Sequence, residues 1–176
     1  MKTQEVNFTM NYANFMHLLS LTIILSLIAP VIVKAQANKA NFSGKWELNE
    51  AKSNLGDSGR RRFGGGNFTA TQEANLLTVE RTFTTQDGEK RTVTSKYTLD
   101  GKESVNTMGR GERKSTANWS ADGKSLTIVT KSSYNGNERT STEVWTLTGS
   151  KTLTIASTRQ GREGGEVKTT MVYDKQ

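Results

Sequence analysis

The chain has 176 residues, enough for one folded domain behind an N-terminal targeting segment. It has no cysteine and one histidine, His17, which lies in the segment expected to be removed, so disulfides, thiolate catalysis and the usual zinc and haem ligand sets are excluded from the mature chain. With 24 Lys and Arg against 17 Asp and Glu, the formal net charge is +7, which attracts anionic partners without identifying one. Only 33% of the residues are hydrophobic, which favours a sheet around a small or partly polar interior.

Residues 1–37 are predicted to be a signal peptide. The run 16–33 is the only long apolar stretch, and an A-x-A pattern follows it at Ala35-Gln36-Ala37. Cleavage is expected near Ala35 or Ala37, which leaves residues 38–176 as a single secreted or periplasmic domain. The alternative is an uncleaved membrane anchor, because the apolar run is nearly long enough to span a bilayer.

From residue 42 onward, short runs rich in Thr, Val, Ile and Leu alternate with short polar turns. Asp-Gly and Asn-Gly between alternating apolar residues are strong hairpin signals, because both central residues can adopt positive φ. Helical periodicity is absent after residue 50 except for a short turn at Glu50–Leu55. Sequential hairpins predict an all-β fold, an antiparallel up-and-down (meander) barrel of about 8–10 strands whose closure removes exposed edges. The predicted strands are 42–49, 67–73, 76–85, 90–99, 103–108, 112–120, 124–134, 137–148, 151–158 and 166–174.

Alternation along each strand separates an inner face from an outer face. In the first strand Phe42, Gly44, Trp46 and Leu48 share one face, while polar residues share the other. The same parity places all three tryptophans inside. The other expected inward anchors are Leu77, Val79, Phe83, Val93, Tyr97, Leu99, Ala117, Trp119, Leu126, Ile128, Trp145, Leu147, Leu153, Ile155, Val167, Met171 and Tyr173.

Parity also carries charged side chains inward, at Arg81, Arg113 and Glu143, with Arg91 and Arg139 nearer strand ends. An inward charge is costly unless it is paired or hydrated. Either the interior is wet and these residues line a ligand site, or an arginine pairs with Glu143 as a structural bridge. In the first case an arginine binds an anionic group and aromatic rings cover an apolar body. The candidate ligand-binding residues are Arg81, Tyr97, Arg113, Trp119, Glu143, Trp145 and Tyr173.

Residues 56–66 form an Arg/Gly-rich loop that contains Arg60, Arg61 and Arg62. Adjacent like charges and several glycines are typical of a solvated connection. The alternative is a surface-acting module that binds acidic polysaccharide or lipid headgroups through these arginines. Nucleic acid is not expected as a partner outside the cytoplasm.

The opening Phe42-Ser-Gly-Lys-Trp-Glu-Leu-Asn49, at the head of a β-meander, resembles the Gly-x-Trp opening of the lipocalin and fatty-acid-binding-protein group of barrels. The following Ala51-Lys-Ser-Asn-Leu-Gly56 resembles openings of bacterial secreted lipocalin-like proteins. The resemblance implies that Gly44 and Trp46 are structural, with Trp46 at the closed end of the barrel. Fatty-acid-binding proteins carry an Arg-x-Tyr carboxylate anchor on the last strand, of which Met171-Val-Tyr173 keeps the tyrosine.

The leading hypothesis is a monomeric carrier that binds a small, largely apolar ligand, either anionic or neutral, inside the barrel. A small hydrophobic or amphiphilic molecule is the expected partner. Membrane association is expected only through an uncleaved signal segment. An enzyme is not expected, because no nucleophile–base–orienter set can be assembled without histidine or cysteine. A carboxylate acid–base site at Glu143, near Arg113 or Tyr97, is the remaining catalytic alternative. No catalytic residue, cofactor or metal site is assigned.

Overall fold

The computed structural model describes residues 39–56, 66–85, 87–108, 111–134, 137–161 and 165–176. Contacts divide the chain into two compact units, Met1–Ala37 and Asn38–Gln176, and the described residues belong to the second. The predicted signal peptide and Arg60–Arg62 lie outside the described residues. Within the described ranges, no helix has the length and apolar character needed to cross a membrane.

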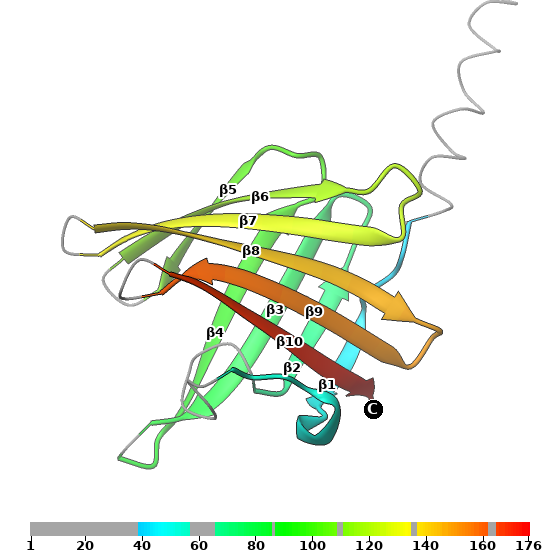
Figure 1. Ribbon diagram of the computed structural model, residues 1–176, viewed down its shortest axis with the longest axis horizontal. Helices are drawn as coiled ribbons and strands as arrows, with labels where there is room; N and C mark the ends of the chain where they lie inside the picture. The colour runs from blue at the N-terminus through cyan, green and yellow to red at the C-terminus, as the bar shows by residue number, and fades with distance from the viewer. Residues whose placement is uncertain (1–38, 57–65, 86, 109–110, 135–136, 162–164) are drawn as a thin grey trace, which may run out of the picture. The chain divides into compact units, whose positions relative to one another are not determined.

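Ten antiparallel strands and one 3-10 turn make up the described fold (Figure 1). All ten predicted strands are present, and their ends agree with the predicted ones to within two residues. The expected turn at Glu50–Leu55 is the 3-10 turn η1. The elements are β1 (Gly44–Leu48), η1 (Glu50–Lys52), β2 (Phe68–Gln72), β3 (Leu76–Thr84), β4 (Lys90–Thr98), β5 (Glu103–Met108), β6 (Gly111–Trp119), β7 (Ser125–Tyr134), β8 (Asn137–Thr148), β9 (Thr152–Gln160) and β10 (Glu166–Lys175).

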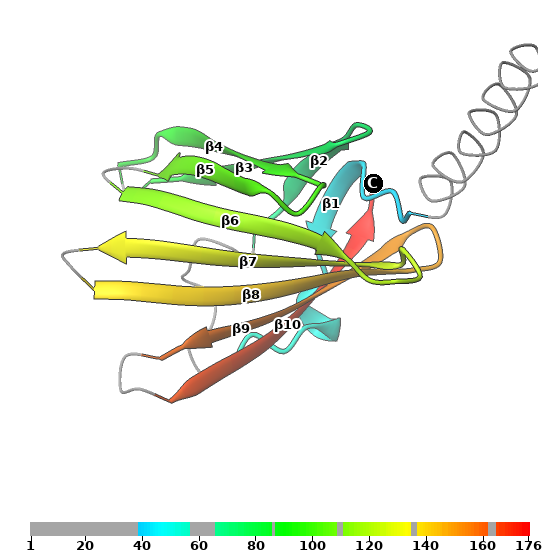
Figure 2. The same ribbon diagram turned by 90° about the horizontal axis from the view of Figure 1, so that it is seen from above.

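The strands form one sheet in the order β4-β3-β2-β1-β10-β9-β8-β7-β6-β5, which curves round a common interior (Figures 1 and 2). Apart from the β1–β10 pair, every pairing joins strands that are consecutive in the chain, as a meander requires. β1 pairs with β10, where Trp46 lies opposite Lys175, so the first and last strands of the chain are neighbours in the sheet. The predicted all-β meander is therefore confirmed.

The barrel is not fully closed, because β4 and β5 occupy the two ends of the sheet order. The expectation that closure removes every exposed edge was wrong here. Side chains of β5, rather than its backbone, hydrogen-bond to the edge of β4, with Ser104 Oγ accepting from the Thr98 amide at 2.8 Å. The short turn between these strands does not bring their backbones into ladder register.

Two Asp-Gly turns show why the hairpins form where the sequence places them. Gly101 and Gly123 have φ of 78° and 70°, in the left-handed region that glycine tolerates best. The preceding carboxylates accept hydrogen bonds from the amides two residues on, at Lys102 and Lys124. The hydrogen bond from the Lys102 amide is the main cause that lowers the pKa of Asp100 to about 2.

Aromatic rings fill one end of the barrel. Phe42 stacks on Trp119 with ring centroids 5.8 Å apart and meets Trp145 edge-on at 5.7 Å. Phe68 continues this chain of contacts to Trp145 at 5.5 Å and to Tyr173 at 4.9 Å. These five residues are called the aromatic floor below. Such ring pairs stabilise by about 0.5–1.5 kcal/mol each beyond the area they bury.

Most of the inward anchors predicted by alternation belong to the buried core or pack against it, whereas Phe83, Val93 and Val167 do not. The buried core consists of Phe42, Trp46, Phe68, Ala70, Leu77, Val79, Leu99, Ala117, Leu126, Ile128, Trp145, Leu153, Ile155, Met171 and Tyr173, with Leu48, Tyr97, Trp119 and Leu147 packed against it. Phe68 and Ala70 were not among the predicted anchors. None of the three tryptophans is exposed.

Candidate functional site

Away from the aromatic floor, the inner wall of the barrel is polar. The registers of β6 to β10 run without interruption, so alternation decides which side chains face inward. One inward row crosses five strands as Ser115, Thr130, Ser141, Arg159 and Val167. Ser115 is 2% exposed, and its hydroxyl lies 2.9 Å from that of Thr130. The hydrophobic core is therefore confined to part of the interior.

Solvent reaches this polar part of the interior. The inward-facing Ser141, Glu143, Ser157 and Arg159 each keep partial exposure, whereas the inward residues at the aromatic floor are almost all buried. Side chains that point inward can retain exposure only if water enters the interior of the barrel. This arrangement suits a ligand that enters from the polar end.

Arg81 lies on β3 at the border between the aromatic floor and the polar wall. Its guanidinium carbon is 4.8 Å from the centroid of the Phe68 ring, within cation–π range. The Arg81 side chain also interacts with the hydroxyl of Tyr173. Its Nε is buried and has no hydrogen-bond partner. A buried donor left unpaired costs about 1–3 kcal/mol, so Arg81 retains unused capacity to bind an acceptor.

Tyr97, on β4, faces the charged groups of three other strands. Burial raises the pKa of Tyr97 and is the largest cause, and the charge of Glu143 raises it further. Arg81 and Arg113 lower it. The structure thus brings Arg81, Tyr97, Arg113 and Glu143 together inside the barrel, from β3, β4, β6 and β8.

Glu143 is held by its neighbour on the same strand and same face. The indole Nε1 of Trp145 donates a hydrogen bond to Glu143 Oε2 at 2.9 Å. Among the described residues, no ion pair joins Glu143 to Arg81 or Arg113. The described residues therefore contain no Arg81–Glu143 or Arg113–Glu143 structural bridge.

Trp119 and Trp145 both belong to the aromatic floor. Trp119 lies between the Phe42 ring and the Lys39 ammonium, which is 5.4 Å from the Trp119 ring centroid. Its Nε1 is buried without a partner. Trp145 is 1% exposed and touches Phe42 and Phe68. Trp145 therefore belongs to the packed core, and Trp119 packs against that core.

Gly44 and Trp46 lie on β1, the strand that pairs with β2 and β10. The Trp46 indole donates a buried hydrogen bond to the Phe42 carbonyl at 2.9 Å. Gly44 has φ of 148°, and a Cβ at this position would collide with the Lys175 side chain. Gly44 and Trp46 thus help to pack β1 against β10.

Several inward polar residues were missed by sequence reasoning, chiefly Arg159 on β9. The sequence contains the pattern that identifies Arg159 as inward, because alternate residues along a strand share a face, and Ser157 and Arg159 follow Leu153 and Ile155 at this spacing. Predicting β9 to end at residue 158 excluded Arg159 from the inward set. In the structure β9 continues to Gln160.

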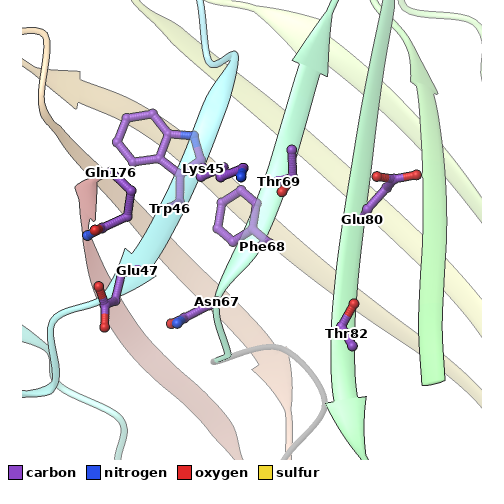
Figure 3. Close-up of a pocket in the computed structure, with 9 residues that line it drawn as sticks. All are labelled: Lys45, Trp46, Glu47, Asn67, Phe68, Thr69, Glu80, Thr82 and Gln176. Carbon is purple, nitrogen blue, oxygen red and sulfur yellow. The ribbon is translucent and has the colours of Figure 1, made fainter. Parts of the chain in front are cut away.

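An open groove of about 330 Å³ lies on the outer face of β1, β2 and β3, away from the predicted site (Figure 3). Trp46 and Phe68, on neighbouring strands, are among its lining residues, together with the cation Lys45 and the anions Glu47 and Glu80. Its lining does not favour one sign of charge.

Among the described residues, no group of three or more His, Cys, Asp and Glu is placed to hold a metal ion.

No protein-family model and no curated protein matches this chain. Solved structures do resemble it. The wild-type fluorescent protein UnaG has a TM-score of 0.50 at 20% identity, over 77% of this chain and 97% of that one. A single-substitution variant of UnaG has a TM-score of 0.51 at 20% identity, over 77% and 96% of the two chains. The similarity is one of fold. It supports the predicted antiparallel β-barrel, and does not identify a ligand.

Proposed function

We propose that this protein is a binding barrel for a small amphiphilic molecule with an apolar body and an anionic group. The apolar body lies on the aromatic floor, against Trp119 and Trp145. The anionic group is bound by Arg81, with Tyr97 and Tyr173 beside it, while Arg113 and Glu143 complete the polar wall. The mature chain that remains after removal of the apolar N-terminal segment acts outside the cytoplasm as a monomer.

One observation carries this proposal: the buried, unpartnered Nε of Arg81 at the border of aromatic and polar surfaces. A guanidinium binds carboxylate and phosphate oxygens through paired N–H donors, and an unsatisfied Nε supplies one of them. The same border meets the general pattern of small-molecule sites, in which mostly apolar walls carry a few placed polar groups. Binding rather than catalysis is proposed, because Tyr and Arg are poor proton shuttles near neutral pH.

The proposal is tested by titrating the mature chain, residues 38–176, with decanoate and with uncharged decanol. Tryptophan fluorescence is the readout, because Trp119 and Trp145 lie on the aromatic floor and report directly on occupancy. We expect saturable change with both ligands and tighter binding of decanoate. Arg81→Gln should reduce decanoate affinity about tenfold and leave decanol affinity nearly unchanged, since only the charged hydrogen bond is lost.

Lys131→Gln is the matched control, because Lys131 lies exposed on the outer face of β7 and its loss removes the same charge. Equal effects of the two substitutions would show that net charge, not the Arg81 site, governs affinity. A wild-type chain that gives no saturable change with any amphiphile would contradict the proposed function itself.

A further inference from the structure

A second group of arginines lies on the inner wall, separate from Arg81. Arg113, Arg139 and Arg159 are called the arginine cluster here. Arg113 on β6 and Arg139 on β8 both lie opposite Ser132 of β7, so Arg113, Ser132 and Arg139 form one inward row. Arg159 on β9 is opposite Ser141 in the adjacent row, diagonal to Arg139. With strands about 4.8 Å apart, the three Cα atoms span about 15 Å of wall, within reach of side chains as long as arginine.

Within the described part of the chain, no carboxylate forms an ion pair with the arginine cluster. Among the described residues, none of its three members takes part in an ion pair. On the described inner faces of β3 to β9, Glu143 is the one acidic side chain, against Arg81, Arg91, Arg113, Arg139 and Arg159. Glu143 already accepts a hydrogen bond from Trp145. Like charges on one concave wall repel each other and concentrate counter-ions, so this part of the wall favours bound anions.

Most of the surrounding side chains are hydrogen-bonding groups, and the apolar Val167 lies opposite Arg159. Ser132 and Ser141 face inward in the same rows as the arginine cluster, and Ser157 faces inward in the next row, opposite Glu143. Ser132 is placed close to Arg139, with its Oγ 3.5 Å from the Arg139 carbonyl oxygen. Serine hydroxyls and guanidinium groups together are the usual donors for carboxylate and phosphate oxygens. An alkyl chain would find few apolar contacts here.

From this distribution we infer that the ligand is at least a dianion, with a second oxyanion held by the arginine cluster. The inference rests on the proposed function and extends it: the first anionic group binds at Arg81, the apolar body lies on the aromatic floor, and the second anionic group faces the polar end. The second group is a carboxylate or a phosphate, because both present the oxygens that arginine and serine recognise.

The test compares decanoate with α,ω-dicarboxylates from octanedioate to dodecanedioate, by isothermal titration calorimetry on the mature chain. A further arm uses chains of the same lengths with a terminal phosphonate in place of the second carboxylate, and tells the two oxyanions apart. We expect the best dianion to bind about tenfold or more tightly than decanoate at low salt, with the advantage shrinking as salt rises. Arg139→Gln and Arg159→Gln should each reduce the dianion advantage and leave decanoate affinity nearly unchanged.

Lys131→Gln again serves as the control, and thermal unfolding of each variant establishes that the barrel is intact. Single substitutions are used because Arg139 and Arg159 retain exposure and their loss leaves the core untouched. Decanoate binding with no dianion advantage at any chain length would overturn this inference alone. Absence of binding by every probe would overturn the proposed function as well, so the two failures are distinct.

Discussion

The side chain of Asn106 hydrogen-bonds to the backbone of Lys96 as a neighbouring strand would. Its Oδ1 accepts a hydrogen bond from the Lys96 amide at 2.7 Å, and its Nδ2 donates one to the Lys96 carbonyl at 2.9 Å. A primary amide reproduces the donor and acceptor of a peptide group, so Asn106 supplies the pair that a ladder would have made. Since β4 and β5 share no ladder, this contact and the Ser104–Thr98 hydrogen bond join the two strands across the barrel's opening.

Replacing Asn106 should loosen β4 at this point. Asn106→Ala removes two hydrogen bonds and is expected to lower the free energy of unfolding by about 1–2 kcal/mol. Hydrogen exchange of the Lys96 amide should accelerate more than that of other β4 amides. Thr107→Ala, an exposed change on the same strand, is the control. Unchanged exchange at Lys96 in Asn106→Ala would show that water replaces the side chain without loss.

Gly44 should resist substitution for reasons of backbone geometry rather than space. A Cβ at Gly44 meets the end of the Lys175 side chain, which can move, but its φ of 148° is a conformation that other residues rarely adopt. Gly44→Ala is expected to cost about 1–3 kcal/mol in the free energy of unfolding, measured by urea denaturation. Lys175→Ala in the same chain removes the collision. Full recovery in the double variant would mean that the collision, not φ, causes the loss.

Alternation predicted the strands and the inward residues of this barrel because period two follows directly from strand geometry. It placed Trp119, Trp145 and Tyr173 inside, where the structure has them. It did not predict that Asn106 and Ser104 bridge β4 and β5, because strand pairing depends on how a twisted sheet closes. Nor did parity decide between an Arg–Glu143 pair and a wet wall, since that depends on side-chain reach across the interior. Arg159 was lost through a strand end misplaced by two residues.

Glu143 should matter for the Trp145 indole even without ligand. Glu143→Gln keeps an oxygen acceptor at the same position and is expected to change the free energy of unfolding by less than about 1 kcal/mol. Glu143→Leu leaves the buried Nε1 of Trp145 without an acceptor and should cost about 1–3 kcal/mol. Chemical denaturation followed by circular dichroism measures both. Equal stability of the two variants would show that the Trp145 donor finds another partner.

Burial of the Tyr173 hydroxyl makes the fold sensitive to alkali. Desolvation is the main cause that raises the pKa of Tyr173 to about 12, from an unfolded value of 10.0, and the charge of Glu143 raises it further, whereas Arg81 opposes the shift. The folded chain therefore holds this proton between pH 10 and 12 while the unfolded chain releases it. The contribution is fully present below pH 10 and is lost as the pH rises through 12. It amounts to about 2–3 kcal/mol, since one pKa unit corresponds to about 1.4 kcal/mol.

Tyr173→Phe should weaken this dependence, because phenylalanine has no proton to release in either state. We expect the free energy of unfolding of the wild type to fall more steeply between pH 9.5 and 11.5 than that of Tyr173→Phe, as measured by urea denaturation at each pH. Tyr97 contributes in the same direction, because burial raises its pKa too. Tyr97→Phe in the Tyr173→Phe chain should therefore flatten the curve further. Parallel curves for the wild type and Tyr173→Phe would mean that Tyr173 ionises in the folded barrel as readily as in the unfolded chain.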